Sequence, residues 1–182
     1  MQTKIAILRG INVGGHRKIL MDELKSMCDE LGLKNIKTYI QSGNLIFNSD
    51  KQNKEIENQL ENAISKTFRF DVPVIVRTKE ELNKAIINNP FFKNNADINR
   101  LFLTFLKEKP NEENLNKILL YDFEPDQFII HNTEAYLFIN GKFHKSKLTN
   151  NFFEKQLKVT ATTRNWKTVI KLSELSKNLG AK

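Results

Sequence analysis

The sequence predicts an α+β fold in which two ferredoxin-like subdomains, each a split β-α-β unit with an antiparallel sheet, are followed by a C-terminal helix. The main observation is that the order strand, helix, strand, strand, helix, strand can be read twice along the chain from the spacing of apolar residues. The composition agrees, because 182 residues with 40% hydrophobic side chains and 13 Phe are enough for two compact cores. We therefore predict a first subdomain over residues 1–79 and a second over residues 80–182, which includes a connecting helix and the C-terminal helix.

The first subdomain is expected to hold four strands and two helices. Short apolar runs such as "KIAILRG" indicate the strands, and apolar residues three or four positions apart, as in "MDELKSMCDELG", indicate the helices. Gly32 ends the first helix, and the pair Ser42 and Gly43 is typical of a tight turn between strands. The expected strands cover residues 4–10, 36–41, 44–49 and 72–78, and the expected helices cover residues 21–31 and 54–68.

The second subdomain repeats this order after a connecting helix over residues 79–89 and a loop that starts at Pro90. Asn132 and Thr133 lie between two apolar runs and are expected to form a hairpin turn. The expected strands cover residues 101–106, 127–131, 135–140 and 158–162, and the expected helices cover residues 112–120, 150–157 and 166–179.

Two glycine-bearing stretches of the first subdomain, "RGINVGG" and "QSGN", lie at strand ends. In a split β-α-β unit the strand order is 4-1-3-2, and the first strand ends where the third begins, so the two stretches should meet at one end of the sheet. We expect a polar site there, with a glycine backbone and a polar rim. Its expected binding residues are Arg9, Gly10, Asn12, Gly14, Gly15, Gln41, Ser42 and Asn44.

The consecutive glycines suit a site for an anion. Glycine allows close backbone approach and positive φ, and successive amides in such a turn can hold a phosphate or carboxylate. The stretch is not a P-loop or a dinucleotide fingerprint, because residues 16–20 separate it from the helix, whose first-turn Asp22 and Glu23 would repel an anion. An anion should therefore lie over the glycine pair, near Arg17 and Lys18. The alternative is a tight turn whose polar side chains only satisfy backbone groups.

The basic C-terminal segment predicts a second anion site. Residues 142–182 contain 10 Lys and Arg and two acidic residues, so the net charge of this segment equals the +8 net charge of the whole chain. This asymmetry favours a polyanion or a phosphorylated ligand, and the alternative is that the lysines only solvate exposed helices. Two strands of the second subdomain end at this edge, and the expected binding residues there are Ser146, Lys147, Arg164 and Asn165.

Further polar groups are expected around this second site. Thr163 or Asn165 can cap the C-terminal helix, whose N-terminus adds partial positive charge. The alternative is that this region only caps the helix and that Trp166 is a core anchor. The neighbouring side chains are expected to be Lys142, Lys145, Lys167, Thr162 and Trp166.

The sequence lacks the motifs of several reaction classes. It has no Cys/His metal spacing, no Ser-His-acid set and no pair of carboxylates beside the predicted site, so we expect no metal and no cofactor and assign no catalytic residue. His16 is the one plausible proton carrier, although a loop histidine is more often only solvated. Cys28 lies in a helix and is expected to be a small buried apolar residue. The first sheet also lacks the aromatic signature of an RNA recognition module.

Location and assembly give two further expectations. No apolar run approaches the roughly 18 to 20 residues of a membrane span, and no signal-peptide segment is recognised, so a cytoplasmic protein without membrane contact is expected. In the first strand, Ile5 and Ile7 face one way while Ala6 and Leu8 face the other, so both faces of the sheet are apolar. The second subdomain or a second copy of the chain, as in a homodimer, is expected to cover the second face.

Four motifs carry a family resemblance: "LRGINVGG", "TYIQSGNLIF", "SKLTN" and "TTRNWKTV". By their order and spacing the chain resembles the bacterial domain of unknown function family sixteen ninety-seven over nearly its whole length. The resemblance implies two ferredoxin-like α+β subdomains and supplies no activity. It gives weight to the polar motifs, since the shared segments include loop residues as well as core.

The leading hypothesis is a cytoplasmic protein that binds a phosphorylated or other anionic small molecule, or a nucleic acid, through its glycine-rich and basic loops. Two other classes stay open. One is an enzyme of unknown reaction that acts on an anionic substrate in a cleft between the subdomains, and the other is a protein-interaction module. The sequence leaves open the ligand, any catalysis, the oligomeric state and the relative orientation of the subdomains, because local pattern does not encode them.

Overall fold

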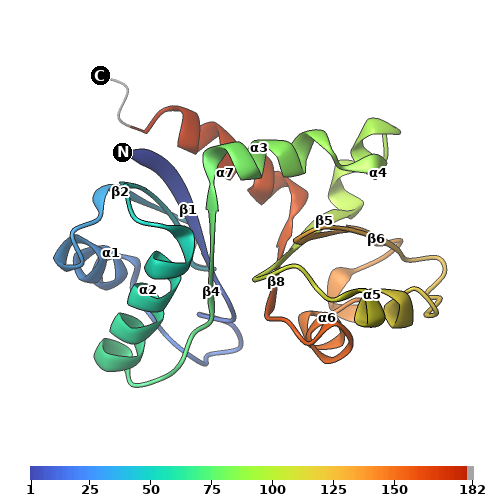
Figure 1. Cartoon of the computed structure of the whole chain (residues 1–182), viewed down its shortest axis with the longest axis horizontal. Helices are drawn as coiled ribbons and strands as arrows, with labels where there is room; N and C mark the ends of the chain where they lie inside the picture. The colour runs from blue at the N-terminus through green and yellow to red at the C-terminus, as the bar shows by residue number, and fades with distance from the viewer. Residues whose placement is uncertain (180–182) are drawn as a thin grey trace. The chain divides into compact units, whose positions relative to one another are not determined.

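The computed structural model describes residues 1–179, which divide into two compact units (Figure 1). Unit 1 contains residues 1–84 and the described residues from Lys171 onward, and unit 2 contains residues 85–170. The chain leaves unit 1 within helix α3 (Lys79–Ile87) and returns within helix α7 (Trp166–Lys177). Among residues 1–179, none of the helices combines the length and the apolar character that a membrane crossing needs.

Unit 1 contains a four-stranded antiparallel sheet in the order β2-β3-β1-β4, which is the predicted 4-1-3-2 order. Helices α1 and α2 cover one face of this sheet (Figure 1), where Leu24 and Leu60 join Ala6 and Leu8 in one buried cluster. Ile5, on the other face of β1, is also fully buried. The strands are β1 (Gln2–Leu8), β2 (Lys34–Tyr39), β3 (Asn44–Ser49) and β4 (Val74–Thr78), and the helices are α1 (Met21–Glu30) and α2 (Asn53–Phe68).

Unit 2 repeats the arrangement with the strand order β6-β7-β5-β8, again antiparallel throughout. Helices α5 and α6 pack on one face through residues such as Ile118 and Phe153, which share a buried cluster with Leu137. The strands are β5 (Leu101–Leu106), β6 (Gln127–His131), β7 (Glu134–Phe138) and β8 (Ala161–Asn165), and the helices are α4 (Pro90–Lys93), α5 (Glu112–Ile118) and α6 (Asn150–Leu157), with 3-10 turns at Ile98–Arg100 and Phe143–Lys145.

The predicted fold class is confirmed, and two element predictions in unit 2 are wrong in detail. The loop expected at Pro90 begins the short helix α4, because the Asn89 side chain accepts hydrogen bonds from the N–H groups of Phe91 (3.0 Å) and Phe92 (3.2 Å). The last strand lies three residues later than expected, at Ala161–Asn165. The cause is Lys158, which ends α6 in the left-handed conformation with φ +59° and delays the strand.

The compact units differ from the predicted subdomains at their C-terminal end. The prediction assigns the whole of residues 80–182 to the second subdomain, whereas the described residues from Lys171 onward group with unit 1. Within unit 1, the Ser173 hydroxyl donates a hydrogen bond of 2.7 Å to the Asn83 side-chain oxygen, and Leu172 is fully buried. The second half of α7 therefore helps to build unit 1.

Candidate functional site

The two glycine-bearing turns of unit 1 lie side by side at one end of its sheet. Strands β1 and β3 pair so that Ile7 is opposite Asn44, and the ladder continues where the Leu8 N–H donates to the Gly43 carbonyl at 2.8 Å. The end of β1 therefore leads into residues 10–17 next to the turn that precedes β3. The juxtaposition expected from strand order is present.

The glycine stretch forms a small hairpin over residues 12–17, which we call the glycine hairpin. The Asn12 N–H donates to the Arg17 carbonyl at 3.2 Å, and the His16 N–H donates to the Val13 carbonyl at 3.1 Å. Between them lie Gly14 and Gly15, with φ of +59° and +78°. Positive φ at both central positions is the pattern of a type I′ turn, which glycine adopts without steric cost. The glycine pair is therefore required by this turn, whatever the hairpin binds.

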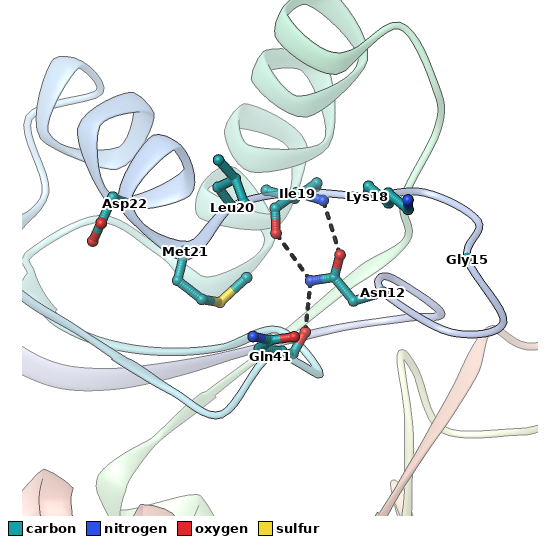
Figure 2. A pocket seen from close by; sticks show the side chains of 8 residues that line it. All are labelled: Asn12, Gly15, Lys18, Ile19, Leu20, Met21, Asp22 and Gln41. Carbon is teal, nitrogen blue, oxygen red and sulfur yellow. Dashed lines mark hydrogen bonds between the residues drawn. The ribbon is translucent and has the colours of Figure 1, made fainter.

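Asn12 ties three segments together (Figure 2). Its side-chain oxygen accepts from the Ile19 N–H at 2.9 Å, and its side-chain nitrogen donates to the carbonyls of Ile19 (3.0 Å) and Gln41 (2.8 Å). Both amide hydrogens are thus used by the backbone. Asn12 was expected on the rim of the binding site, and the structure makes it a positioning residue that holds the glycine hairpin against the neighbouring turn.

The neighbouring turn, residues 40–43, is held from its other side by Asn44. This side chain is fully buried and donates to the Tyr39 carbonyl at 3.0 Å and to the Ser42 hydroxyl at 3.1 Å. Ile40 lies between Tyr39 and Gln41, whose carbonyls accept the hydrogen bonds from Asn44 and Asn12. It has φ +51°, although β-branched residues rarely adopt positive φ. Two asparagine side chains therefore stabilise a strained turn, and neither is available as the main binding group.

A cavity of about 410 Å³ opens beside these turns. Its polar wall comes from the glycine hairpin and from Gln41, and its apolar wall comes from the segment that leads into α1 (Figure 2). Leu20 precedes α1 and supplies no side-chain hydrogen bond to the helix, so the first amides of α1 lack a side-chain cap. The lining residues are Asn12, Gly15, Lys18, Ile19, Leu20, Met21, Asp22 and Gln41.

The charged side chains near the cavity lie in different directions. Lys18 is exposed and lines the cavity on the side of Gly15, whereas Asp22 lies at the opposite end (Figure 2). The Arg17 guanidinium lies over the backbone of Gly10, since a Cβ added there would be 3.6 Å from Arg17 Nη1. The electrostatic field across the cavity therefore runs from a cationic end to an anionic end.

The structure disperses the expected second site in unit 2. The Ser146 hydroxyl donates to the Asp126 carboxylate at 2.6 Å, next to the start of β6, whereas Arg164 is in β8 at the opposite edge of the sheet. Asn165 caps α7 by accepting from the Thr168 N–H at 2.8 Å. These residues therefore do not meet at one place. The negative charge of the Asp126 carboxylate beside Ser146 also disfavours an anion at Ser146 and the adjacent Lys147.

Arg164, which was expected to be a binding residue, is buried in unit 2. Its guanidinium donates to the Thr162 hydroxyl at 3.2 Å and to the Thr163 carbonyl at 3.0 Å, and burial lowers its pKa to about 10. Trp166, two residues later at the start of α7, is also fully buried. Their contacts within unit 2 fit the alternative of capping and core packing.

Other reactive groups are few in the described part of the chain. Among residues 1–179 no cluster of three or more His, Cys, Asp or Glu side chains could hold a metal ion. His16 is exposed on the glycine hairpin and lies 3.9 Å from the position of a Cβ added at Gly14. Cys28 is fully buried, and this burial raises its pKa to about 12.

The buried thiol leads to a simple expected result. Because Cys28 is buried and its raised pKa keeps the thiol protonated, we expect iodoacetamide to leave the native chain unlabelled at pH 8. Mass spectrometry of the same chain unfolded in guanidinium, where the thiol is exposed, should show one added group and serves as the control. Equal labelling rates in the folded and unfolded chains would contradict the expected burial.

Sequence reasoning missed the apolar wall of the cavity and the role of Asn12. In the sequence, the wall residues Leu20 and Met21 are indistinguishable from the start of an ordinary amphipathic helix. One signal could have found them: the position before "MDEL" carries Leu20 where a capping Ser, Thr, Asp or Asn is usual. A helix end that lacks a side-chain cap is open to another hydrogen-bond acceptor.

Comparisons with known proteins agree with the fold. Residues 1–136 match the model of the family described as "Protein of unknown function (DUF1697)". The structure resembles that of the conserved bacterial protein SP0830 from Streptococcus pneumoniae, with a TM-score of 0.78 and 22% sequence identity over 96% of this chain and 98% of the other. No curated protein matches the sequence. At this identity the structural likeness concerns the fold alone.

Proposed function

The chain belongs to the DUF1697 family of proteins of unknown function, and we propose from its own geometry that it binds an anionic small molecule in the cavity beside the glycine hairpin. The ligand class is a compound with a phosphate or carboxylate group. One observation carries the proposal: Lys18 and the start of α1, which has no side-chain cap, open onto the same cavity.

Two cationic features support binding at this place. In the described part of the chain no hydrogen bond or ion pair engages the Lys18 ammonium, so its charge is available to a ligand. The first N–H groups of a helix carry partial positive charge, and here Leu20 leaves them without a side-chain acceptor. A ligand with a phosphate or carboxylate at Lys18 and a further hydrogen-bond acceptor toward the helix start would satisfy both features.

The two carboxylates at the start of α1 decide where the anion lies. Asp22 and Glu23 occupy the first turn of the helix and repel a second negative charge near them. The Asp22 side chain is at the end of the cavity away from Lys18 and Gly15 (Figure 2). The anionic group therefore lies at the Lys18 end, and the remainder of the ligand extends toward Leu20 and the helix.

The size and lining of the cavity favour a small molecule over a polymer. About 410 Å³ lies within the usual range of roughly 300 to 1,000 Å³ for small-molecule sites. Leu20 is 68% exposed and lines the cavity together with Met21, so an apolar or aromatic part of the ligand has a surface to contact. The Gln41 side chain is exposed at the cavity and offers both a donor and an acceptor.

The proposed location is the cytoplasm, where phosphorylated metabolites are abundant and where a chain with one reduced cysteine is stable. The proposal covers binding and assigns no reaction. Nucleic acid is the less favoured ligand, because the cavity is concave and small whereas single-stranded nucleic acid is usually bound along an extended groove with aromatic stacking.

The test is a calorimetric titration of the whole chain with inorganic phosphate, pyrophosphate, nucleoside monophosphates and citrate. We expect saturable binding of at least one compound, and Lys18→Gln should weaken it about tenfold, which is the loss of one charge-assisted hydrogen bond of about 1.5 kcal/mol. Asp22→Asn should strengthen it, since it removes the opposing charge.

Lys25→Gln is the matched control, because Lys25 is exposed on α1 outside the cavity and the change removes the same charge. It should leave the affinity within about twofold, as expected for a screened distant charge. Absence of binding by the wild-type chain, or equal weakening by the two lysine variants, would refute a site at the glycine hairpin.

A further inference from the structure

Strand β6 is an open edge of the unit 2 sheet. It comes first in the order β6-β7-β5-β8 and pairs with β7 in a regular register from Gln127 opposite Phe138 to His131 opposite Glu134. Its sequence, "QFIIH", contains no Lys, Arg or Pro, and its ladder contains no bulge. Charged residues, Pro and bulges are among the devices by which natural sheets protect an exposed edge from pairing with another strand.

The corresponding edge strand of unit 1 is protected. Strand β2 occupies the same place in its sheet and carries Lys34 and Lys37, with a shift of register between them. Asn35 in this irregular part has φ +54°, which bends the strand away from ideal pairing geometry. The two sheets have the same topology but differ at this edge, and of the two strands β2 and β6 it is β6 that is suited to accept another strand.

The geometry of the β6-β7 hairpin fixes which groups β6 presents. The hairpin closes through a two-residue turn at Asn132 and Thr133, so the pair His131 and Glu134 exchanges hydrogen bonds across the ladder. The alternation of an antiparallel ladder then turns the N–H and C=O groups of residues 127, 129 and 131 toward β7. The groups of Phe128 and Ile130 point outward, and no backbone hydrogen bond from elsewhere in residues 1–179 reaches them.

The side chains of β6 also lack a neighbour. Phe128 and Ile130 pack against the buried cluster beneath α5 and α6, yet both are only half-buried. Ile129, on the other face of the sheet, is 43% exposed. A strand beside β6 would cover all three side chains, and it would need apolar residues at the alternate positions on one face.

We propose that β6 pairs with β6 of a second copy of the chain, in an antiparallel arrangement with its two-fold axis at Ile129. Phe128 then lies opposite Ile130 of the second copy, and this pair exchanges both backbone hydrogen bonds on each side of the axis. Gln127 lies opposite His131 of the second copy. The strand is therefore complementary to itself, and the two sheets join into one sheet of eight strands.

The second copy is favoured over another protein because, in this register, the outward backbone N–H and C=O groups of Phe128 and Ile130 all find partners in β6 of the second copy. Only five residues pair on each side, so the contact is well below the standard interface of about 1,600 Å² and the dimer should be weak. Sedimentation equilibrium of the whole chain from about 1 µM to about 1 mM covers the affinities expected of such an interface.

Two double variants test the register with equal numbers of changes at exposed positions. Gln127→Glu with His131→Lys places opposite charges across both ends of the paired strands and should dimerise at least as tightly as the wild type. Gln127→Lys with His131→Lys places like charges there and should dimerise at least about tenfold more weakly. The two variants share the change at His131, so its effect within the hairpin cancels.

A single substitution and an exchange measurement complete the test. Ile129→Lys adds an edge lysine at the two-fold axis and should give a monomer, whereas Ile87→Lys, at an isoleucine that is 65% exposed on α3, should not change association. In hydrogen exchange by NMR, the amides of Phe128 and Ile130 should gain protection as the concentration rises, and the amide of Ile129 should not.

Three outcomes would overturn the proposal. They are a monomer at every concentration, a dimer that binds equally tightly in both charge variants, and a dimer without added protection at Phe128 and Ile130. Neither the ligand titration nor the Lys18→Gln variant enters these readouts, so the dimer and the anion site succeed or fail separately.

Discussion

Gly43→Ala is expected to destabilise the chain by about 3 kcal/mol. An added Cβ would lie 2.7 Å from Ile11 Cδ1 and 2.8 Å from Leu8 Cβ, and the second of these atoms cannot rotate away. The φ of +78° adds about 1 kcal/mol for a residue with a side chain, and the overpacking adds about 1 to 3 kcal/mol. The free energy of unfolding in urea measures the sum.

Gly32→Ala is the matched control for this substitution. Gly32 has nearly the same φ, +79°, but no heavy atom lies within 4 Å of an added Cβ. The free energy of unfolding should therefore fall only by the cost of positive φ for a residue with a side chain, about 1 kcal/mol. If the two variants lose the same free energy, the close packing of the 40–43 turn against β1 and Ile11 is not a determinant of stability.

Asn12→Asp is expected to cost about 2 to 4 kcal/mol at pH 7 and to abolish ligand binding. The new oxygen replaces a nitrogen that donates to the carbonyls of Ile19 and Gln41, so two hydrogen bonds are lost and an anionic oxygen faces two acceptors. The glycine hairpin should then separate from the 40–43 turn and deform the cavity. Urea unfolding and the phosphate titration measure the two consequences.

This substitution also has an expected pH dependence. The two facing carbonyls disfavour the charged form of the introduced carboxyl, so its pKa is higher in the folded state than in the unfolded state. The variant therefore regains stability relative to the wild type as the pH falls from 7 to 4, because the protonated acid can donate one bond. Asn62→Asp, at an exposed position of α2, is the isosteric control and should show neither effect.

The sequence predicts the fold well because both strand alternation and helical spacing depend on burial along one local element. Strands β3, β5 and β6 begin and end where the apolar pattern predicts. The meeting of the two glycine-bearing turns follows from strand order alone, so it was also predictable. The misplaced strand β8 shows the limit, because the left-handed end of α6 at Lys158 leaves no mark in hydrophobic spacing.

The contacts of polar side chains were much less predictable. Ser146 was expected to bind an anion, but its partner is Asp126, which is 20 residues away and belongs to another loop. Arg164 was expected after the last strand, whereas in the structure it lies within β8 two residues from Thr162, so alternation places both on one face, and both are buried. Its charge suggested a role in anion binding, whereas its position in the sheet buries it.

The grouping of the second half of α7 with unit 1 has a consequence for how the chain is made. During synthesis residues 1–84 emerge before unit 2, but the helix that carries Leu172 and Ser173 emerges after it. Unit 1 is complete only after unit 2 has been synthesised, so unit 2 can fold before unit 1 closes. A fragment cut at residue 84 is therefore an unfinished unit.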